Sequence, residues 1–220
     1  MNAFAALGVG DKLISLLNMQ GIKVPTPIQQ AAIPSIFKGK DFIGRAQTGT
    51  GKTLAYLLPT MQRVNREKGA TQVLIMTPTR ELSKQVFDVF RPFALELGLD
   101  GVDIIGGRTI ENQLQKLKRD PQVIIGTPGR LLDHIRRRSL DLSQVKTVIL
   151  DEADQMLANG FREDIEALVD ETPKNRQLLL FSATMPEEAV RLARKYMKHP
   201  AVVDVSEKVA ASTVEQRVYE

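Results

Sequence analysis

The sequence predicts an α/β domain of three layers, in which a central, mostly parallel sheet is flanked by helices. Short apolar runs of strand length recur along most of the chain, at residues 42–44, 73–76, 102–105, 123–125, 148–150, 178–181 and 202–205. Segments with helical spacing separate them, as at residues 80–97 and 187–198. Strands that alternate with helices are joined by right-handed crossovers, which give a parallel sheet covered on both faces. Ligand-binding loops then lie at the carboxyl ends of the strands.

Length and composition agree with a globular protein of this kind. The chain has 220 residues, of which 43% are hydrophobic and 25% are charged, so it can bury the core of one large or two small domains. The formal net charge of +4 is compatible with a polyanionic partner without demonstrating one. The basic clusters at 116–119 and 136–138 are more typical of solvated helix ends than of a binding patch.

The chain contains no cysteine, which excludes disulfides, thiolate metal sites and cysteine nucleophiles. A chain of this composition fits a reducing compartment. No apolar run approaches the length of a membrane span, so we expect no membrane partner. Together these observations favour a cytoplasmic protein.

The chain is expected to divide into three segments. Residues 1–40 form a helical region of the same domain, because apolar residues at 13, 14, 16 and 17 have helical spacing, Gly21 interrupts it, and Pro25-Thr26-Pro27 begins a second helix. Residues 41–205 form the sheet domain itself. Residues 206–220 are polar without a clear apolar face, and we interpret them as a linker.

The first motif that carries chemistry is Ala46-Gln47-Thr48-Gly49-Thr50-Gly51-Lys52-Thr53, between the run at 42–44 and a helical segment. Such a turn directs successive backbone N–H groups toward one phosphate chain, and the helix N-terminus adds positive charge there. Lys52 can reach the β- and γ-phosphates, and the Thr53 hydroxyl can ligate Mg²⁺. Ala46 replaces the first glycine of the consensus, and a plain glycine-rich turn is the simpler alternative. We predict a nucleoside triphosphate site, with an accessible Lys52 ammonium when the loop is empty.

A second acidic motif, Asp151-Glu152-Ala153-Asp154, directly follows the apolar run at 148–150. Asp151 can hold Mg²⁺, directly or through water, while Glu152 can orient and deprotonate an attacking water. An acidic helix N-terminus, which the helix dipole favours, would give the same pattern. Beside the phosphate loop upstream, the catalytic interpretation is the stronger one.

A third motif lies upstream of the phosphate loop, at Gly21-Ile22-Lys23-Val24-Pro25-Thr26-Pro27-Ile28-Gln29. With the Asp-Glu-Ala-Asp sequence at 151–154, it makes almost the whole chain resemble the first RecA-like domain of a DEAD-box RNA helicase. The resemblance implies an ATP-dependent RNA helicase that uses ATP and Mg²⁺. It also implies that Lys23 and Gln29 of this Q motif contact the nucleotide, Gln29 at the adenine edge, and that Phe4 packs on the adenine ring. Without the resemblance, Phe4 would be interpreted as a core residue and Gln29 as a surface residue.

Three further motifs match those that line an RNA groove in the family, although Ser83 stands where alanine is usual after the first. They contain the residues Pro78, Thr79, Arg80, Gly106, Gly107, Thr127, Pro128, Gly129 and Arg130. Hydroxyls, guanidinium groups and exposed N–H groups grip a nucleic-acid backbone without reading its bases. By themselves, the glycine and proline pairs would be turn signals.

The segment Ser182-Ala183-Thr184 resembles the motif that couples nucleotide to domain movement in the family. The resemblance implies that the hydroxyls of Ser182 and Thr184 bond near Asp154. On its own the segment would be a helix N-cap before Pro186.

The resemblance also implies partners: an RNA backbone, contacted without sequence specificity, and a second RecA-like domain that supplies an arginine finger. We expect the domain of residues 1–220 to be a monomer and, without the second domain, nearly inactive. Two alternatives remain open. One is another phosphate-loop class, such as a nucleoside kinase or a DNA translocase, and the other is a non-processive RNA clamp or scaffold on the same fold.

Overall fold

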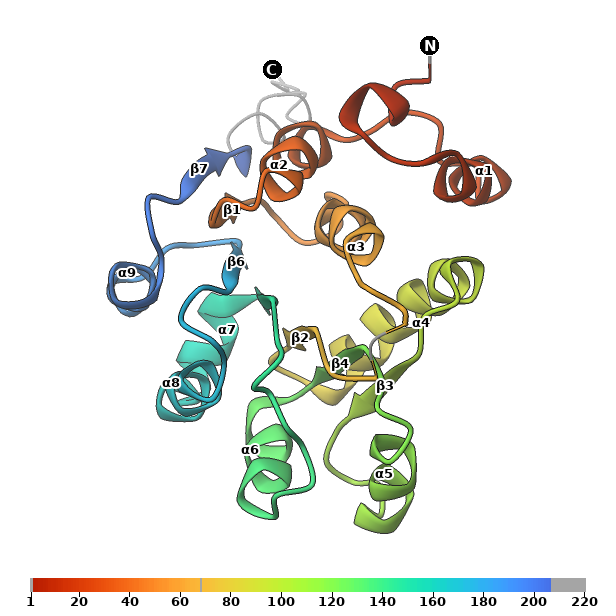
Figure 1. Ribbon diagram of the computed structural model, residues 1–220. Helices are drawn as coiled ribbons and strands as arrows, with labels where there is room; N and C mark the ends of the chain where they lie inside the picture. Colours follow the sequence, from red (N-terminus) through yellow and green to blue (C-terminus); the bar gives the residue numbers. More distant parts are fainter. Residues whose placement is uncertain (1, 68, 207–220) are drawn as a thin grey trace, which may run out of the picture.

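A seven-stranded sheet, in which every neighbouring pair is parallel, forms the centre of the molecule (Figure 1). The computed structural model describes residues 2–67 and 69–206. The strands are β1 (Phe42–Arg45), β2 (Val73–Met76), β3 (Gly101–Ile104), β4 (Val123–Gly126), β5 (Thr147–Asp151), β6 (Gln177–Ser182) and β7 (Ala201–Asp204). Their order across the sheet is β3-β4-β2-β5-β6-β1-β7. The predicted α/β class with a parallel sheet is confirmed, and each predicted apolar run overlaps a strand.

Helices cover both faces of the sheet. After a short 3₁₀ turn at Ala5–Leu7, they are α1 (Asp11–Met19), α2 (Pro27–Phe37), α3 (Lys52–Gln62), α4 (Arg80–Leu97), α5 (Ile110–Leu117), α6 (Pro128–Arg136), α7 (Ala153–Ala158), α8 (Arg162–Asp170) and α9 (Glu187–Tyr196). Figure 1 shows α1 to α4 on one side of the sheet and α5 to α9 on the other. The molecule therefore has the three predicted layers.

Alternation along each strand builds a separate core on each face. In β5, Ile149 packs with the side chains of α1 to α4, whereas Val148 and Leu150 pack with those of α5 to α9. The same alternation holds in β2, where Ile75 and Leu74 point to opposite faces. Both faces of these strands are buried, so their sequences are continuously apolar rather than alternating.

The last helix ends two residues before its predicted end at 198. Met197 is extended, and the backbone N–H of Lys198 donates to Asp41 Oδ2 at 2.6 Å. Asp41 is buried, and its Oδ1 accepts from the Leu178 N–H at 2.7 Å. The Asp41 carboxylate thus accepts from one backbone N–H of β6 and one of the segment after α9. A longer α9 would use the Lys198 N–H within the helix.

The predicted division at residues 40 and 205 stays a prediction. The helices of the first segment pack into the same core as α3 and α4, through side chains such as Leu17 and Ile33. Of the predicted linker, Ser206 is described and residues 207–220 lie outside the described residues.

Gly126 provides a test of the β3–β4 ladder. A Cβ at this position would overlap the backbone carbonyl oxygen of Ile104 and lie 3.1 Å from Leu131 Cδ2. We expect Gly126→Ala to lower the free energy of unfolding by about 1–3 kcal/mol, as overpacking of a core does. Urea unfolding followed by circular dichroism measures it.

Gly129→Ala is the matched control for that substitution. A Cβ at Gly129 would approach Asp164 Oδ2 at an ordinary 3.6 Å, and the residue lies in helix α6. It should be neutral or stabilise by about 0.5–1 kcal/mol. Equal effects of the two substitutions would contradict the close approach at Gly126.

Candidate functional site

The sheet order brings three of the predicted motifs to one edge. Strands β5, β6 and β1 are neighbours, so their carboxyl ends place Asp151, Ser182 and the loop after Arg45 side by side. The Ala46 N–H donates to the Ser182 carbonyl at 3.0 Å, which fixes the phosphate loop to the end of β6. Segments far apart in the sequence therefore form one site.

The predicted phosphate loop has the backbone that its glycines allow. Gly49 and Gly51 have φ angles of 83° and 90°, in the left-handed region where a side chain is strained. A Cβ at Gly51 would also come within 2.5 Å of Gln29 Nε2. Within the loop, the Thr50 hydroxyl donates to the Gln47 carbonyl at 2.7 Å. Helix α3 begins at Lys52, so its N-terminus faces the space above the loop.

Lys52 corrects one expectation. Its side chain is buried, with 6% of its surface exposed, and Nζ donates to the Ala46 carbonyl at 3.1 Å. The expected accessible ammonium is therefore wrong: the loop folds back and its own carbonyl satisfies the charge. An anion that binds Lys52 would have to replace the Ala46 carbonyl as its hydrogen-bond partner.

Asp151 has one carboxylate oxygen free of any hydrogen-bond partner among the described residues. It is 2% exposed; Oδ2 accepts from the Tyr56 hydroxyl at 2.8 Å, while Oδ1 is buried and unpartnered. Burial raises the pKa of Asp151 to about 6, although the Tyr56 hydrogen bond and the charge of Lys52 oppose the shift. The same burial, together with the charge of Asp151, raises the pKa of Tyr56 well above its usual value.

This oxygen fits a divalent cation. Thr53, half-buried on the first turn of α3, follows Lys52 directly and offers a hydroxyl at the same edge of the sheet. Over the described ranges, no group of three or more His, Asp or Glu side chains is arranged to hold a metal. The residues therefore suit Mg²⁺ that arrives with phosphate and water ligands rather than an all-protein cage.

Glu152 has an unusual backbone for its type. Its φ and ψ are 53° and 52°, a left-handed conformation that costs a non-glycine residue energy and is often found at functional sites. Its Oε1 accepts from the hydroxyl of Thr48 in the phosphate loop at 3.1 Å. The conformation turns the Glu152 side chain toward the loop and away from the start of α7.

The two Q-motif residues differ in burial: Gln29 is buried beside the phosphate loop, and Lys23 is exposed. Gln29 is buried; its Oε1 accepts from the Thr26 N–H at 3.0 Å and its Nε2 donates to the Gly51 carbonyl at 3.1 Å. One amide hydrogen and one lone pair remain for a ligand. Lys23 is exposed, and among the described residues no hydrogen bond or ion pair joins it to the loop.

Phe4 differs from its expected position. The side chain is fully buried in the core formed with α1 to α4. A base cannot stack on a ring that the core covers, so the structure does not support the adenine contact that the resemblance implied. The core interpretation of Phe4, which the residue type favours, agrees with its burial.

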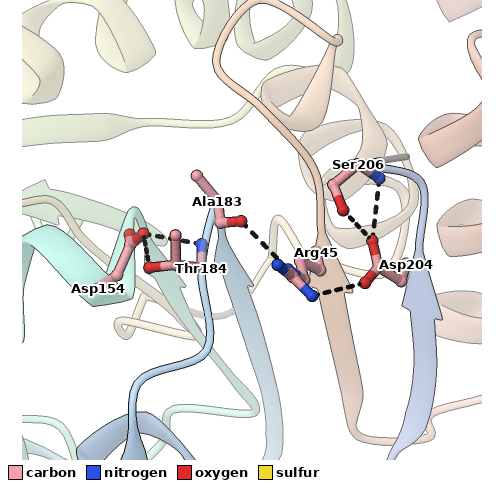
Figure 2. Close-up of polar contacts among 6 residues, drawn as sticks. All are labelled: Arg45, Asp154, Ala183, Thr184, Asp204 and Ser206. Atoms are coloured by element: carbon pink, nitrogen blue, oxygen red, sulfur yellow. Dashed lines mark hydrogen bonds and ion pairs between the residues drawn. The ribbon is translucent and has the colours of Figure 1, made fainter. Parts of the chain in front are cut away.

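The three predicted coupling residues, Asp154, Ser182 and Thr184, are joined by hydrogen bonds, and Figure 2 shows those between Asp154 and Thr184. Asp154 Oδ2 accepts from the backbone N–H of Thr184 at 2.9 Å and from its hydroxyl at 2.7 Å. The backbone N–H of Asp154 donates to Ser182 Oγ at 3.1 Å. Burial alone would raise the pKa of Asp154, but the hydrogen bonds from Thr184 and Ser182 outweigh it and lower that pKa. Asp154 is therefore held as a carboxylate.

A hollow of about 590 Å³ lies at the next part of the same edge. Most of the predicted backbone-contact residues line it: Pro78, Thr79, Arg80, Gly106, Thr127, Gly129 and Arg130. Pro128 is buried in the first turn of α6, and Gly107 lies behind Arg80, where a Cβ would come within 2.5 Å of Nη1. The remaining wall includes Glu81, Asp133 and Phe161.

Two arginines, Arg80 and Arg130, bring positive charge to the hollow, and Glu81 and Asp133 bring negative charge to the same wall. Arg80 is exposed and lies over Gly106 and Gly107. Arg130 donates through Nη2 to the Arg108 carbonyl at 3.4 Å, while its Nη1 is buried without a partner among the described residues. Thr79 caps α4 by accepting from the Leu82 N–H at 3.1 Å, so the helix N-terminus also faces this space.

Sequence reasoning missed His134, which joins the walls of the hollow. Its ring is fully buried; Nε2 lies 2.9 Å from Gln113 Oε1 on α5, and Nδ1 lies 2.8 Å from Ser139 Oγ. Gln113 Nε2 donates to the Ile105 carbonyl at 2.7 Å, just before the glycine pair. Because Gln113 uses its NH₂ there, its oxygen accepts from His134 Nε2–H. The only signal in the sequence is a histidine one turn after the Thr127–Arg130 motif.

Tyr56 was also missed. It lies one helical turn after Lys52, so both face the end of β5, and the spacing of four residues is the only signal that could have found it.

The fold and site define a class: an α/β protein with a phosphate loop after one strand, an acidic motif after a neighbouring strand and a polar, arginine-containing hollow beside them. The family model described as DEAD/DEAH box helicase matches residues 26–192, well over half of the chain. The chain belongs to this family.

Relatives give the same assignment. The chain is 43% identical over 217 residues to an ATP-dependent RNA helicase DeaD of Buchnera aphidicola, covering 98% of this chain and 36% of that protein. It is 42% identical to an ATP-dependent RNA helicase CshA of Listeria monocytogenes, covering 98% of this chain and 42% of the relative. The chain thus spans about two fifths of the length of these relatives.

A solved structure is also similar. The crystal structure of a DEAD box protein from the hyperthermophile Methanococcus jannaschii superposes with a TM-score of 0.88 and 37% identity, covering 94% of this chain and 57% of that one. Among helices of the described residues, none has the length and apolarity to cross a membrane.

His134 should make stability depend on pH. Burial lowers its pKa below 6.5, so the unfolded chain binds more protons, and stability is lost as the pH falls below about 6.5. Asp151 acts in the opposite direction, since its raised pKa makes the folded chain take up a proton near pH 6. Asp151 is present in both the unmodified protein and His134→Gln. The difference between their pH dependences of stability therefore gives the contribution of the histidine.

We expect His134→Gln to be less stable at pH 7.5 but to lose less stability between pH 7.5 and 5.5 than the unmodified protein. Denaturant unfolding at each pH measures both. Parallel curves for the two proteins would show that His134 does not titrate on unfolding.

Proposed function

We propose that this chain is a RecA-like domain of an ATP-dependent RNA helicase, which binds ATP·Mg²⁺ and one side of an RNA backbone. The observation that carries the proposal is the meeting of the phosphate loop, the free oxygen of Asp151 and the Asp154–Thr184 contact at one sheet edge. The names of the relatives support the activity, and a cysteine-free composition supports a cytoplasmic location.

The loop residues would hold the phosphates. Backbone N–H groups from Gln47 to Thr53 surround the N-terminus of α3, which favours anions. Lys52 exchanges the Ala46 carbonyl for the β- and γ-phosphates. Thr53 and Asp151 would hold Mg²⁺, which supplies neutralisation of the phosphate charge when it is bound.

Glu152 is the proposed base. It lies beside the loop, where its carboxylate can orient a water and accept its proton. The hydrogen bond from the Thr48 hydroxyl holds this carboxylate in place. Charge that develops on the γ-phosphoryl group needs a further cation, worth about 10³–10⁵ in rate in related enzymes. A second RecA-like domain would supply it, so these residues alone should hydrolyse ATP slowly.

The hollow with Arg80 and Arg130 is the proposed RNA contact. Arg80, Arg130 and the capping Thr79 present guanidinium and hydroxyl groups, which grip phosphates and sugars. Asp154 is hydrogen-bonded to Thr184 beside the nucleotide site. Through this contact, binding of the nucleotide would change the affinity for RNA, and the reverse. The predicted coupling role of Ser182 rests on its bond to the Asp154 backbone.

Base selectivity should depend on Gln29. Its free N–H and lone pair match adenine N7 and N6, whereas guanine O6 cannot donate to the Gln29 carbonyl. We expect fluorescent ADP to bind more tightly than fluorescent GDP by about 1–3 kcal/mol, the usual value of a bidentate base contact. Gln29→Ala should remove the preference.

Two variants control this titration. Gln30→Ala, whose exposed side chain only donates to the Pro25 carbonyl, should keep the selectivity. Lys52→Ala should weaken both nucleotides, with thermal unfolding used to verify folding because Lys52 is buried. Equal affinity of ADP and GDP for the unmodified chain would refute the base-reading role, and no effect of Lys52→Ala would refute the nucleotide site.

RNA binding should be weak, indifferent to sequence and sensitive to salt, because one side of a groove neutralises few phosphates. Arg80→Ala should reduce the slope of log affinity against log salt by about 0.7, the value for one phosphate of a single strand. Arg91→Ala, exposed on the same helix but outside the hollow, should leave it unchanged. Fluorescence anisotropy with two unrelated RNA sequences measures the slope, and salt-insensitive binding to one of them would contradict the proposed groove.

A further inference from the structure

Arg45 lies at the centre of three strand ends. It is the last residue of β1, and the parallel registers pair it with Ser182 of β6 and Asp204 of β7. Its carbonyl accepts from the Val205 N–H at 2.9 Å, and the next residue, Ala46, donates to the Ser182 carbonyl at 3.0 Å. Arg45 therefore touches the phosphate loop, the coupling motif and the last strand through the backbone alone.

Its side chain joins two of these segments, the coupling motif and the last strand, a second time (Figure 2). Nε donates to the Ala183 carbonyl at 3.3 Å, and Nη1 lies 3.0 Å from Asp204 Oδ2. The other oxygen of Asp204 accepts from the N–H of Ser206 at 2.9 Å and from its hydroxyl at 2.5 Å. On the far side of Ala183, Thr184 donates to Asp154. Figure 2 shows these groups in one row from Asp154 to Ser206.

The fold does not need the Arg45 side chain. The two members of the Arg45–Asp204 pair are 42% and 41% exposed, and exposed ion pairs add little to folding because water and salt screen them. A guanidinium, however, fixes two acceptors in one plane, which an ammonium cannot do. The geometry therefore favours a role in orientation over a role in stability.

We propose that Arg45 is a positioning residue that links the nucleotide site to the last strand and to the chain that follows it. It holds the Ala183 carbonyl, and with it the Thr184 contact to Asp154, in fixed register with Asp204 and Ser206. When Lys52 leaves the Ala46 carbonyl for a phosphate, the shift at Ala46 reaches Ser206 through the guanidinium. The inference rests on the proposed nucleotide site.

The experiment is amide hydrogen exchange by NMR at Thr184 and Ser206, whose N–H groups end the row, with and without ADP and Mg²⁺. We expect the nucleotide to change the exchange rate of the Ser206 amide by about fivefold or more, the lower end of usual coupling between sites. Arg45→Gln should abolish this change at Ser206 while leaving the ADP dissociation constant within about twofold, since it makes no proposed ligand contact.

Arg45→Lys distinguishes the bridging geometry of the guanidinium from its positive charge. A lysine can keep the ion pair with Asp204 but cannot bridge to Ala183 as well, so it should retain thermal stability without restoring the nucleotide response at Ser206. Arg137→Gln, which breaks an exposed ion pair with Asp133 on α6, is the matched control and should keep the full response.

The outcomes are distinct. A full response in Arg45→Lys, an unchanged response in Arg45→Gln, or no response in the unmodified protein that binds ADP would each overturn the positioning role. Failure of the unmodified protein to bind ADP would instead refute the proposed nucleotide site, and the inference with it.

Discussion

The adjacency of β5, β6 and β1 in the sheet is the constraint on which the site depends. Parallel strands end at a common edge, so the acidic motif, the coupling motif and the phosphate loop meet although about 30 to 130 residues separate them in the chain. Backbone hydrogen bonds then fix the distances, as between Ala46 and Ser182. The strands supply the buried core on both faces of the sheet, so the loops that follow them need not pack apolar side chains and can carry polar ones.

Burial of the Asp151 carboxylate costs free energy, and the proposed contact with a cation would offset that cost. A carboxylate with one unpartnered oxygen in the core would be replaced by an apolar residue if stability alone mattered. Its pKa of about 6 shows that burial outweighs the favourable contacts from Tyr56 and Lys52. In the proposed complex, a cation bound at the free oxygen would balance the charge of the Asp151 carboxylate.

The layers, the strand positions and the meeting of the main motifs could be predicted, because apolar periodicity and loop motifs are local properties of the sequence. Burial of Lys52 could not, because it depends on the loop carbonyl that the folded chain places beside its ammonium, whereas burial of Phe4 follows from its residue type and only the resemblance suggested otherwise. The Gln113–His134 pair was missed for a similar reason: neither residue belongs to a motif, and only the packing of α5 against α6 brings them together. The end of α9 was missed because Asp41, far away in the chain, accepts the Lys198 N–H.

The Lys52–Ala46 contact connects occupancy of the loop to the rest of the edge. The Ala46 carbonyl is neutral and a phosphate is negatively charged, so in the proposed complex the exchange would place an opposite charge beside the buried ammonium of Lys52. The exchange frees the carbonyl of a residue whose N–H is bonded to Ser182. Ser182 also accepts from the Asp154 backbone, so two hydrogen bonds join Ala46 to the acidic motif. If a phosphate takes the place of the Ala46 carbonyl, as proposed, the buried Lys52 would link occupancy of the loop to these neighbours.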